Sequence, residues 1–154
     1  MKSKDQKYPK SLIEEACSIL RLNDRGGYTV PTERLYPYQW NWDSAICALG
    51  WHHFDKARAW NEIRMLLKGQ WDNGMLPHII FHQDSPDYFP NADVWNVSET
   101  CFQEGVEHPQ TSGISQPPVL ATCVRKLWGA DKESAIKSSE LKQICIKILN
   151  WHRW

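Results

Sequence analysis

Apolar residues recur at the spacing of an α-helix in five stretches of the chain. The predicted helices cover about residues 10–22, 42–54, 56–69, 115–129 and 132–154. Asp55 is the expected N-cap of the third helix. Ser115 is the expected cap of the fourth, with Pro117 and Pro118 in its first turn and Gly129 at its end. The pattern therefore predicts an all-α chain.

Residues 70–114 lack this periodicity and are rich in Pro, Asp, Asn and Gly. A long irregular segment is unusual in a compact domain and is commonly functional. The last helix is still periodic at residues 151–154, with no Gly, Asn or Pro after it. We expect the chain to continue in a longer protein, and a frayed natural terminus is the alternative.

Composition narrows the function classes. Eighteen Lys and Arg balance 18 Asp and Glu, which argues against nucleic acid or an anionic membrane as the main partner. No apolar run approaches the roughly 20 residues of a membrane span, and no signal peptide is recognised at the N-terminus. The five scattered cysteines contain no Cys-x-x-Cys pair, and four have apolar neighbours, which is typical of buried free thiols in a reducing cytoplasm.

Nine of the 18 aromatic residues are tryptophan, which is more than core filling suggests. The densest cluster, residues 36–44, places Trp40 and Trp42 beside Asp43. Aromatic faces stack on the C–H faces of a sugar, while carboxylates and amides bind its hydroxyl groups. Asp43 also lies near a predicted helix start, where a carboxylate is favoured for capping alone. From the residues, capping and ligand binding are equally favoured.

Three further clusters lie on connections between helices. In residues 72–78, Gly and Pro restrict the backbone. His78 and His82 are four apart, but the segment lacks the helix and glutamate of a zinc motif, so no metal is expected and His82 should bond to backbone. Tyr88 and Trp95 mark an aromatic loop that fits a lid or ordinary packing. Gln116 offers a donor and an acceptor at a helix start. Together the clusters indicate one concave small-ligand site.

These clusters resemble glycoside hydrolase family 63. The resemblance is carried by the aromatic Trp-Asp-Ser segment 36–44, the Gly-Met-Leu-Pro-His segment 74–78, Tyr-Phe-Pro at 88–90, and Ser-Gly-Ile-Ser-Gln-Pro-Pro at 112–118. It is strongest to the bacterial mannosylglycerate and glucosylglycerate hydrolases and covers roughly residues 16–154. Family 37 trehalases share two of the elements. Any one string is weak, but four in the same order form a specific signal.

The resemblance implies part of an (α/α)6 barrel, about five of its twelve helices, from an inverting exo-glycosidase that needs no cofactor. It assigns these residues to the substrate pocket: Tyr36, Trp40, Trp42, Asp43, His78, Tyr88 and Gln116. Gln116 would hydrogen-bond the substrate, Tyr88 would lie on a mobile loop over the glycerate end, and His78 would form pocket wall.

The resemblance also implies that the catalytic carboxylates lie elsewhere. Inversion needs a general acid and a general base about 6.5–9.5 Å apart. In the family, the acid is an Asp in a Trp-Glu-Ser-Gly-x-Asp-Asn-Ser segment, expected beyond Trp154, and the base is a Glu further on. Residues 1–154 would be the N-terminal part of one catalytic domain, with the remainder of that domain as partner. Alone they should be inactive.

Residues 98–110 have no clear counterpart in the family. A non-catalytic carbohydrate-binding module is the alternative function. Binding of single-stranded nucleic acid by stacked aromatic rings fits the tryptophan count but not the neutral charge.

Overall fold

The computed structural model describes residues 10–86, 88–130 and 135–154. In this part of the chain, the α-helices are α1 (Lys10–Leu22), α2 (Asn41–His52), α3 (Lys56–Leu67), α4 (Ala92–Trp95), α5 (Leu120–Ala130) and α6 (Ser138–Arg153). The strands are β1 (Gln39–Trp40), β2 (Ile79–Phe81) and β3 (Gln110–Thr111), and a 3-10 helix covers Glu99–Cys101.

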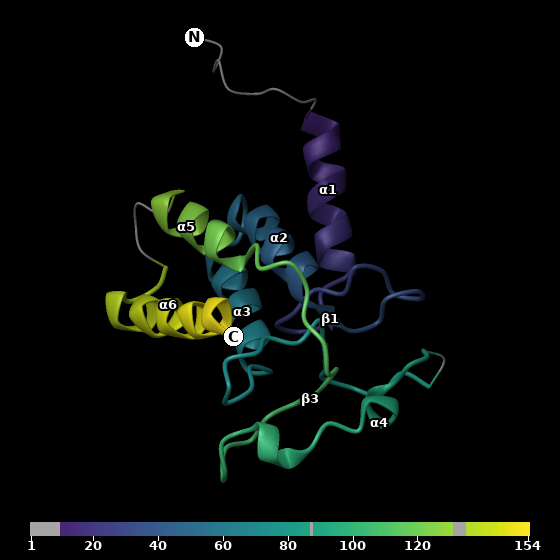
Figure 1. Ribbon diagram of the computed structural model, residues 1–154. Coiled ribbons are helices and arrows are strands. Elements are labelled where there is room, and N and C mark those ends of the chain that lie inside the picture. The colour runs from purple at the N-terminus through teal and green to yellow at the C-terminus, as the bar shows by residue number, and fades with distance from the viewer. Residues whose placement is uncertain (1–9, 87, 131–134) are drawn as a thin grey trace.

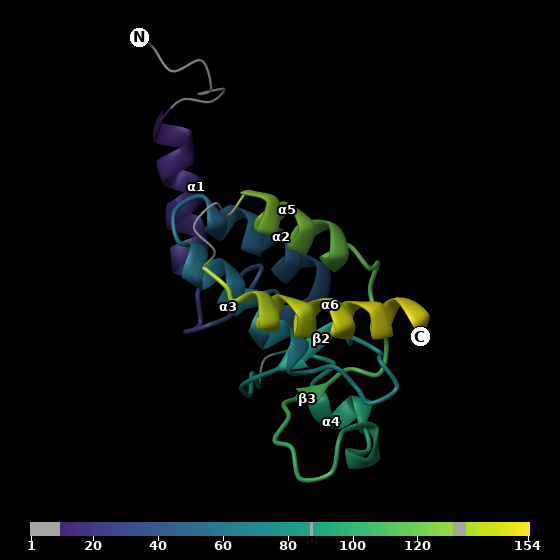
Figure 2. The same cartoon turned by 90° about the vertical axis from the view of Figure 1, so that its left-hand side faces the viewer.

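Helices α2 and α3 form the centre of the helical layer. Ala45 and Ala48 of α2 are fully buried, as are Trp60 and Ile63 of α3. The small alanine side chains let the larger ones pack close to the α2 backbone. Helix α5 lies along α2, and α6 lies beside α3 and α5 (Figures 1 and 2). Burial of each large side chain in this core contributes about 1.5–3 kcal/mol.

The structure confirms the predicted bounds of α1 and the predicted cap of α3. Helix α1 covers the expected residues 10–22. Helix α3 begins after Asp55, whose side chain accepts a hydrogen bond from the Arg58 backbone N–H at 2.9 Å. This bond satisfies one of the four amides that have no partner within the helix.

A small antiparallel sheet corrects the prediction of an all-α chain. Strand β2 lies in its centre, with Ile80 opposite Gln39 of β1 on one side and Thr111 of β3 on the other. All three residues of β2 are buried, and β1 and β3 have two residues each. Such short strands show no alternation of apolar and polar residues, so hydrophobic periodicity could not reveal them.

The last two helices begin later than predicted. Helix α5 begins at Leu120, and Ser115 does not cap it; the Ser115 hydroxyl instead donates to the Leu76 carbonyl at 2.6 Å. Proline disfavours the helical conformation in the residue before it, so Pro117 and Pro118 oppose a helix at residues 116 and 117. Gly129 lies inside the last turn of α5, and α6 begins at Ser138. Residues 131–134 lie outside the described residues.

Helix α1 has no buried residue and projects from the other helices (Figure 2).

All five cysteines are free, but only Cys123 is buried and Cys145 is exposed, so the expectation of four buried thiols was wrong. Burial raises the pKa of the Cys47 thiol to about 12. Among the helices of the described segments, none is long and apolar enough to cross a membrane.

Candidate functional site

The first turn of α2 is the point where three of the four sequence clusters meet. The Asn41 backbone N–H donates to the His78 carbonyl at 3.0 Å, and its side-chain amide donates to the carbonyls of Leu76 and Pro77. The Trp42 backbone N–H donates to the Gln116 side-chain oxygen at 3.1 Å. A backbone carbonyl and a side-chain oxygen from distant segments thus take the place of a local helix cap.

An aromatic cluster lies directly before α2. The Trp40 ring makes edge contacts with Tyr36 and Tyr88, at centroid distances of 5.2 and 5.6 Å, and a tilted contact with Tyr38 at 6.1 Å. Tyr38 in turn contacts Tyr88 and Phe81 at 5.2 and 4.7 Å. Trp40 is only 6% exposed, because these neighbours cover it. The structure therefore brings three predicted site residues, Tyr36, Trp40 and Tyr88, into one group.

Trp42 and Asp43 lie at the surface beside this cluster. Trp42 is 42% exposed and Asp43 is half-buried in the first turn of α2. Helix α2 begins at Asn41, so Asp43 is not its N-cap, although a carboxylate in the first turn is favoured by the helix dipole. Burial raises the pKa of Asp43. A carboxyl group that retains this desolvation cost beside an exposed indole is suited to binding a polar ligand.

His78 and His82 occupy different environments. His78 Nδ1 lies 2.6 Å from the Ser112 hydroxyl, and its ring is 5.4 Å from that of Trp95. His82 Nε2 lies 2.7 Å from the Gln39 side-chain oxygen, so the expectation of a backbone partner was wrong. Burial lowers the pKa of both, that of His82 to about 4. Both imidazoles are therefore neutral at pH 7, and each has a hydrogen-bonding partner.

Sequence reasoning missed a buried carboxylate behind the junction of β1 and α2. Glu62 of α3 is fully buried and contacts Gln39 and Ser44 on either side of the residues assigned to substrate binding. A signal was present: Glu62 lies three residues after Ala59 and four before Leu66, both on the apolar face of α3. A charged residue on an apolar stripe indicates a buried polar network.

The region around the first turn of α2 carries aromatic and polar groups from several segments. In the described part of the chain, no three His, Cys, Asp or Glu side chains are grouped so that they could hold a metal ion. The region offers rings in edge-to-face contact, the Asp43 carboxylate and the Gln116 amide.

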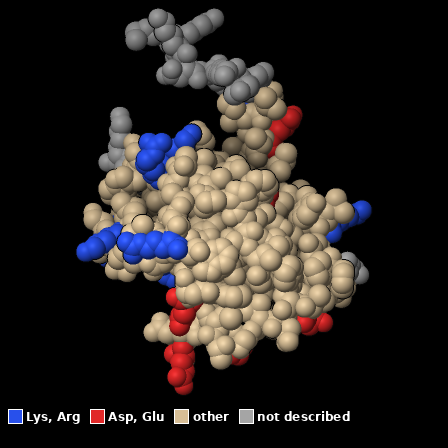
Figure 3. Space-filling model, in the orientation of Figure 1, with Lys and Arg blue, Asp and Glu red and all other residues tan. Residues whose placement is uncertain are grey.

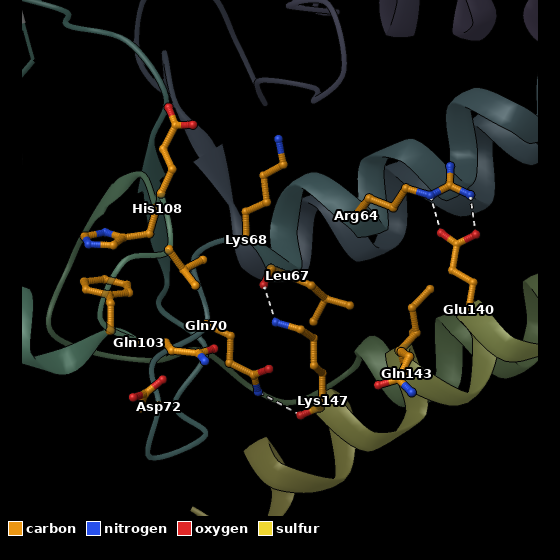
Figure 4. Close-up of a pocket in the computed structure, with 14 residues that line it drawn as sticks. Arg64, Leu67, Lys68, Gln70, Asp72, Gln103, His108, Glu140, Gln143 and Lys147 are labelled. Atoms are coloured by element: carbon orange, nitrogen blue, oxygen red, sulfur yellow. Dashed lines mark hydrogen bonds and ion pairs between the residues drawn. The ribbon is translucent and has the colours of Figure 1, made fainter.

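The cavity shown in Figure 4 lies elsewhere, between α3, α6 and residues 102–108, and has a volume of about 350 Å³. Its walls contain a two-pronged ion pair between Arg64 and Glu140, and Lys147, whose ammonium group donates to the Leu67 carbonyl. None of the seven predicted site residues lines it. Because none of the predicted residues reaches it, we do not assign the ligand site to this cavity.

Comparisons with known proteins identify the family of this chain. A family described as the mannosylglycerate hydrolase MGH1-like glycoside hydrolase domain matches residues 36–154. Mannosylglycerate hydrolase MGH1 of Selaginella moellendorffii is 45% identical over 146 residues, which are 94% of this chain and 28% of that protein. The mannosylglycerate hydrolase of Thermus thermophilus is 48% identical over 141 residues, 91% of this chain and 32% of that protein.

The fold is also that of solved relatives. Two crystal structures of a family 63 mannosylglycerate hydrolase from Thermus thermophilus, one with Tris and D-glycerate and one with glucose, match with TM-scores of 0.76 and 0.70. Their sequence identities are 45% and 44%, and the matches cover 93% of this chain and 32% and 34% of the crystallised chains. The chain thus spans about a third of the length of these relatives. It belongs to the MGH1-like, family 63 glycoside hydrolases.

Proposed function

We propose that this chain supplies part of the sugar pocket of an inverting α-glycosidase, which hydrolyses a small α-glycoside such as mannosylglycerate or glucosylglycerate. The observation that carries the proposal is the convergence of the aromatic cluster, Asp43 and Gln116 at the first turn of α2. Named relatives hydrolyse mannosylglycerate, and the Thermus enzyme has been crystallised with glucose and with D-glycerate.

Each residue has a role that its exposure supports. Trp42 presents an exposed indole on which a sugar ring can stack, and Asp43 accepts hydrogen bonds from its hydroxyl groups. Trp40 is mostly covered, so it contributes its remaining exposed edge and supports Tyr36 and Tyr88.

The remaining three residues extend the pocket. Gln116 uses its oxygen on Trp42 and keeps its NH2 group for the substrate. Tyr88 lies on the loop that would close over the glycerate end. His78 forms pocket wall, held by Ser112.

The catalytic carboxylates belong, in this proposal, to parts of the protein outside residues 1–154. An inverting enzyme holds its general acid and general base about 6.5–9.5 Å apart, so that a water molecule fits between the base and the sugar. Asp43 is assigned to binding. Glu62 is fully buried and fully engaged in hydrogen bonds, so it cannot reach a glycosidic oxygen.

We propose that the remainder of the catalytic domain completes an (α/α)6 barrel and covers the apolar faces that these helices expose. A groove of about 420 Å³ between α5 and α6 is lined by Val124, Trp128 and Leu149. Ile46 of α2 is also exposed. Figure 3 shows a broad area without charged residues across the centre of the view, with Lys and Arg at its edge near α5 and α6. Exposed apolar surface of this kind is typical of a protein interface.

The test uses the protein in its full natural length with mannosylglycerate and glucosylglycerate as substrates. We expect release of free hexose and glycerate, and NMR of the fresh product should show the β-anomer, as inversion at an α-glycoside requires. Absence of hydrolysis of these and other α-glycosides, combined with tryptophan-dependent sugar binding, would instead indicate the carbohydrate-binding module.

A further inference from the structure

Glu62 is the most heavily hydrogen-bonded side chain in the described part of the chain. Its Oε1 accepts from the Thr29 backbone N–H at 3.1 Å, the Gln39 amide at 3.2 Å and the Ser44 hydroxyl at 2.6 Å. Its Oε2 accepts from the Thr29 hydroxyl at 2.7 Å and forms an ion pair with the Arg58 guanidinium at 2.9 Å. Four hydrogen bonds and a guanidinium directed at two oxygens favour an ionised carboxylate.

The charge is balanced within the same network. Arg58 also donates to Asp24 at 2.9 Å and lies 4.6 Å over the ring of Trp51. The Trp51 indole N–H donates to the Thr29 hydroxyl at 2.8 Å. A buried carboxylate is strongly unfavourable unless it is paired and hydrogen-bonded, and here it is both.

Two of the donors flank the residues assigned to substrate binding. Gln39 precedes Trp40, and Ser44 follows Asp43, so Glu62 holds both ends of residues 39–44, which we name the β1–α2 junction. The junction turns from strand to helix within these six residues. A single rigid acceptor behind it therefore fixes the direction in which Trp42 and Asp43 project.

Glu62 also orients the Gln39 amide. Since the Gln39 NH2 group donates to Glu62, its oxygen faces His82, whose Nε2 lies 2.7 Å away. The imidazole must then carry its proton on Nε2 and donate it. This chain of bonds ties the end of β2 to α3 through the junction.

We infer that Glu62 is a positioning residue for the sugar pocket, which holds the β1–α2 junction so that Trp42 and Asp43 meet the substrate. The inference rests on the proposed function for its catalytic consequence, but the placement of the junction can be measured without activity. Glu62 itself is buried behind the junction and touches no substrate.

The test compares two variants with a matched control in the full-length protein. Glu62→Gln keeps the shape but removes the charge, and Ser44→Ala removes a single bond to the same oxygen and should fold normally. Glu140→Gln is the control, because it also removes a carboxylate paired with an α3 arginine, Arg64, but lies far from the junction.

The first readout is amide hydrogen exchange of peptides that cover residues 39–44. We expect exchange there to increase roughly tenfold in Glu62→Gln and less in Ser44→Ala, with no change in Glu140→Gln. Unchanged exchange in both junction variants would overturn the inference, whatever their activity. If the wild-type protein hydrolyses no α-glycoside, the proposed function fails, and this readout still decides whether Glu62 positions the junction.

The second readout separates positioning from stability. Well below the melting temperature, Glu62→Gln should raise KM roughly tenfold, the size expected when a charged hydrogen bond is lost, while Glu140→Gln keeps the wild-type KM. The Glu62→Gln and Ser44→Ala effects on KM should be non-additive in the double variant, since they act through one bond. A lower melting temperature with unchanged KM would show a merely structural role and overturn the inference.

Discussion

The Gln116 side-chain oxygen accepts a hydrogen bond from the Trp42 backbone N–H at 3.1 Å, across 74 positions of sequence. This contact replaces a local cap at the start of α2, where the N-cap residue Trp40 contributes no side-chain bond. One residue therefore anchors the helix that carries Trp42 and Asp43, and in our proposal it also binds the substrate.

Substitution of Gln116 should separate these two roles. Gln116→Ala is expected to lower the free energy of unfolding by about 1 kcal/mol, as the loss of a helix cap does. Gln116→Glu keeps an acceptor and places a negative charge at the helix N-terminus, so stability should be retained. Both variants lose the amide donor, so both should raise KM. Thermal melts measure the stability and steady-state kinetics measure KM, with the exposed Gln103→Ala variant as control. A wild-type KM in both Gln116 variants would show that Gln116 does not bind the substrate.

Asp43→Asn should reduce activity without loss of stability. Burial raises the pKa of Asp43, so the folded state binds a proton more readily than the unfolded chain, and ionisation lowers stability as the pH rises above about 3.8. The Asn variant avoids this cost at pH 7. Loss of the charged acceptor should lower kcat/KM roughly 10–100-fold.

The control for Asp43→Asn is Asp55→Asn, because Asn also caps helices and should replace the Asp55 cap of α3. It should leave both melting temperature and kcat/KM close to wild type. An Asp43→Asn variant with wild-type kcat/KM would exclude Asp43 from the pocket.

His82 should make the fold less stable in acid. Its folded-state pKa of about 4 lies below the usual 6.5. The stabilisation of the fold by neutral His82 is therefore fully present above pH 6.5 and is lost as the pH falls toward 4. The loss amounts to up to about 3 kcal/mol. His82→Gln keeps a donor for Gln39 and should flatten the dependence, leaving the part due to His78. Urea unfolding between pH 4 and 7 measures the slope, and an unchanged slope would contradict the assignment.

Two glycines should respond to alanine in opposite directions. Gly74 has a φ of +98°, and a Cβ there would lie 2.6 Å from the Asn150 carbonyl oxygen, so Gly74→Ala should cost about 2 kcal/mol or more. Gly129 lies inside α5, and a Cβ there would meet no atom of the described residues within 4 Å. Gly129→Ala should therefore stabilise the fold by about 0.5–1 kcal/mol. Calorimetry of the two variants tests both signs.

The 154-residue chain by itself should associate in solution. Trp128 of α5 and Leu149 of α6 are exposed beside the apolar groove, and such surface promotes association. Leu149→Lys should shift sedimentation toward the monomer, whereas Val106→Lys, at an exposed apolar position in a loop, should not. A wild-type chain that is monomeric at all concentrations would contradict this expectation.

Helices whose apolar spacing and caps lie within a few residues of each other could be predicted from the sequence. Helix α1 was predicted from its apolar spacing and α3 also from its cap at Asp55. The sheet was missed because strands of two and three residues carry no period, and the start of α5 was misplaced because Ser115 bonds to Leu76 rather than to its own helix.

The roles of Glu62 and Gln116 depend on partners far away in sequence. Gln39 is 23 residues from Glu62, and Trp42 is 74 from Gln116. Such contacts depend on how the helices pack, and a single sequence does not contain that information. A residue whose type conflicts with its helix face, as Glu62 does, is the one sign available beforehand.

The pairing of β2 with β3 has a consequence for how substrate preference can change. Opposed Phe81 and Gln110 hold the two ends of the 82–109 segment next to each other. His82 and Tyr88, in its first part, contact residues 39 and 40, whereas residues 96–109 can gain, lose or exchange residues without moving the first turn of α2. In our proposal, recognition of the group attached to the sugar can diversify in residues 96–109, while the sugar-binding surface remains unchanged.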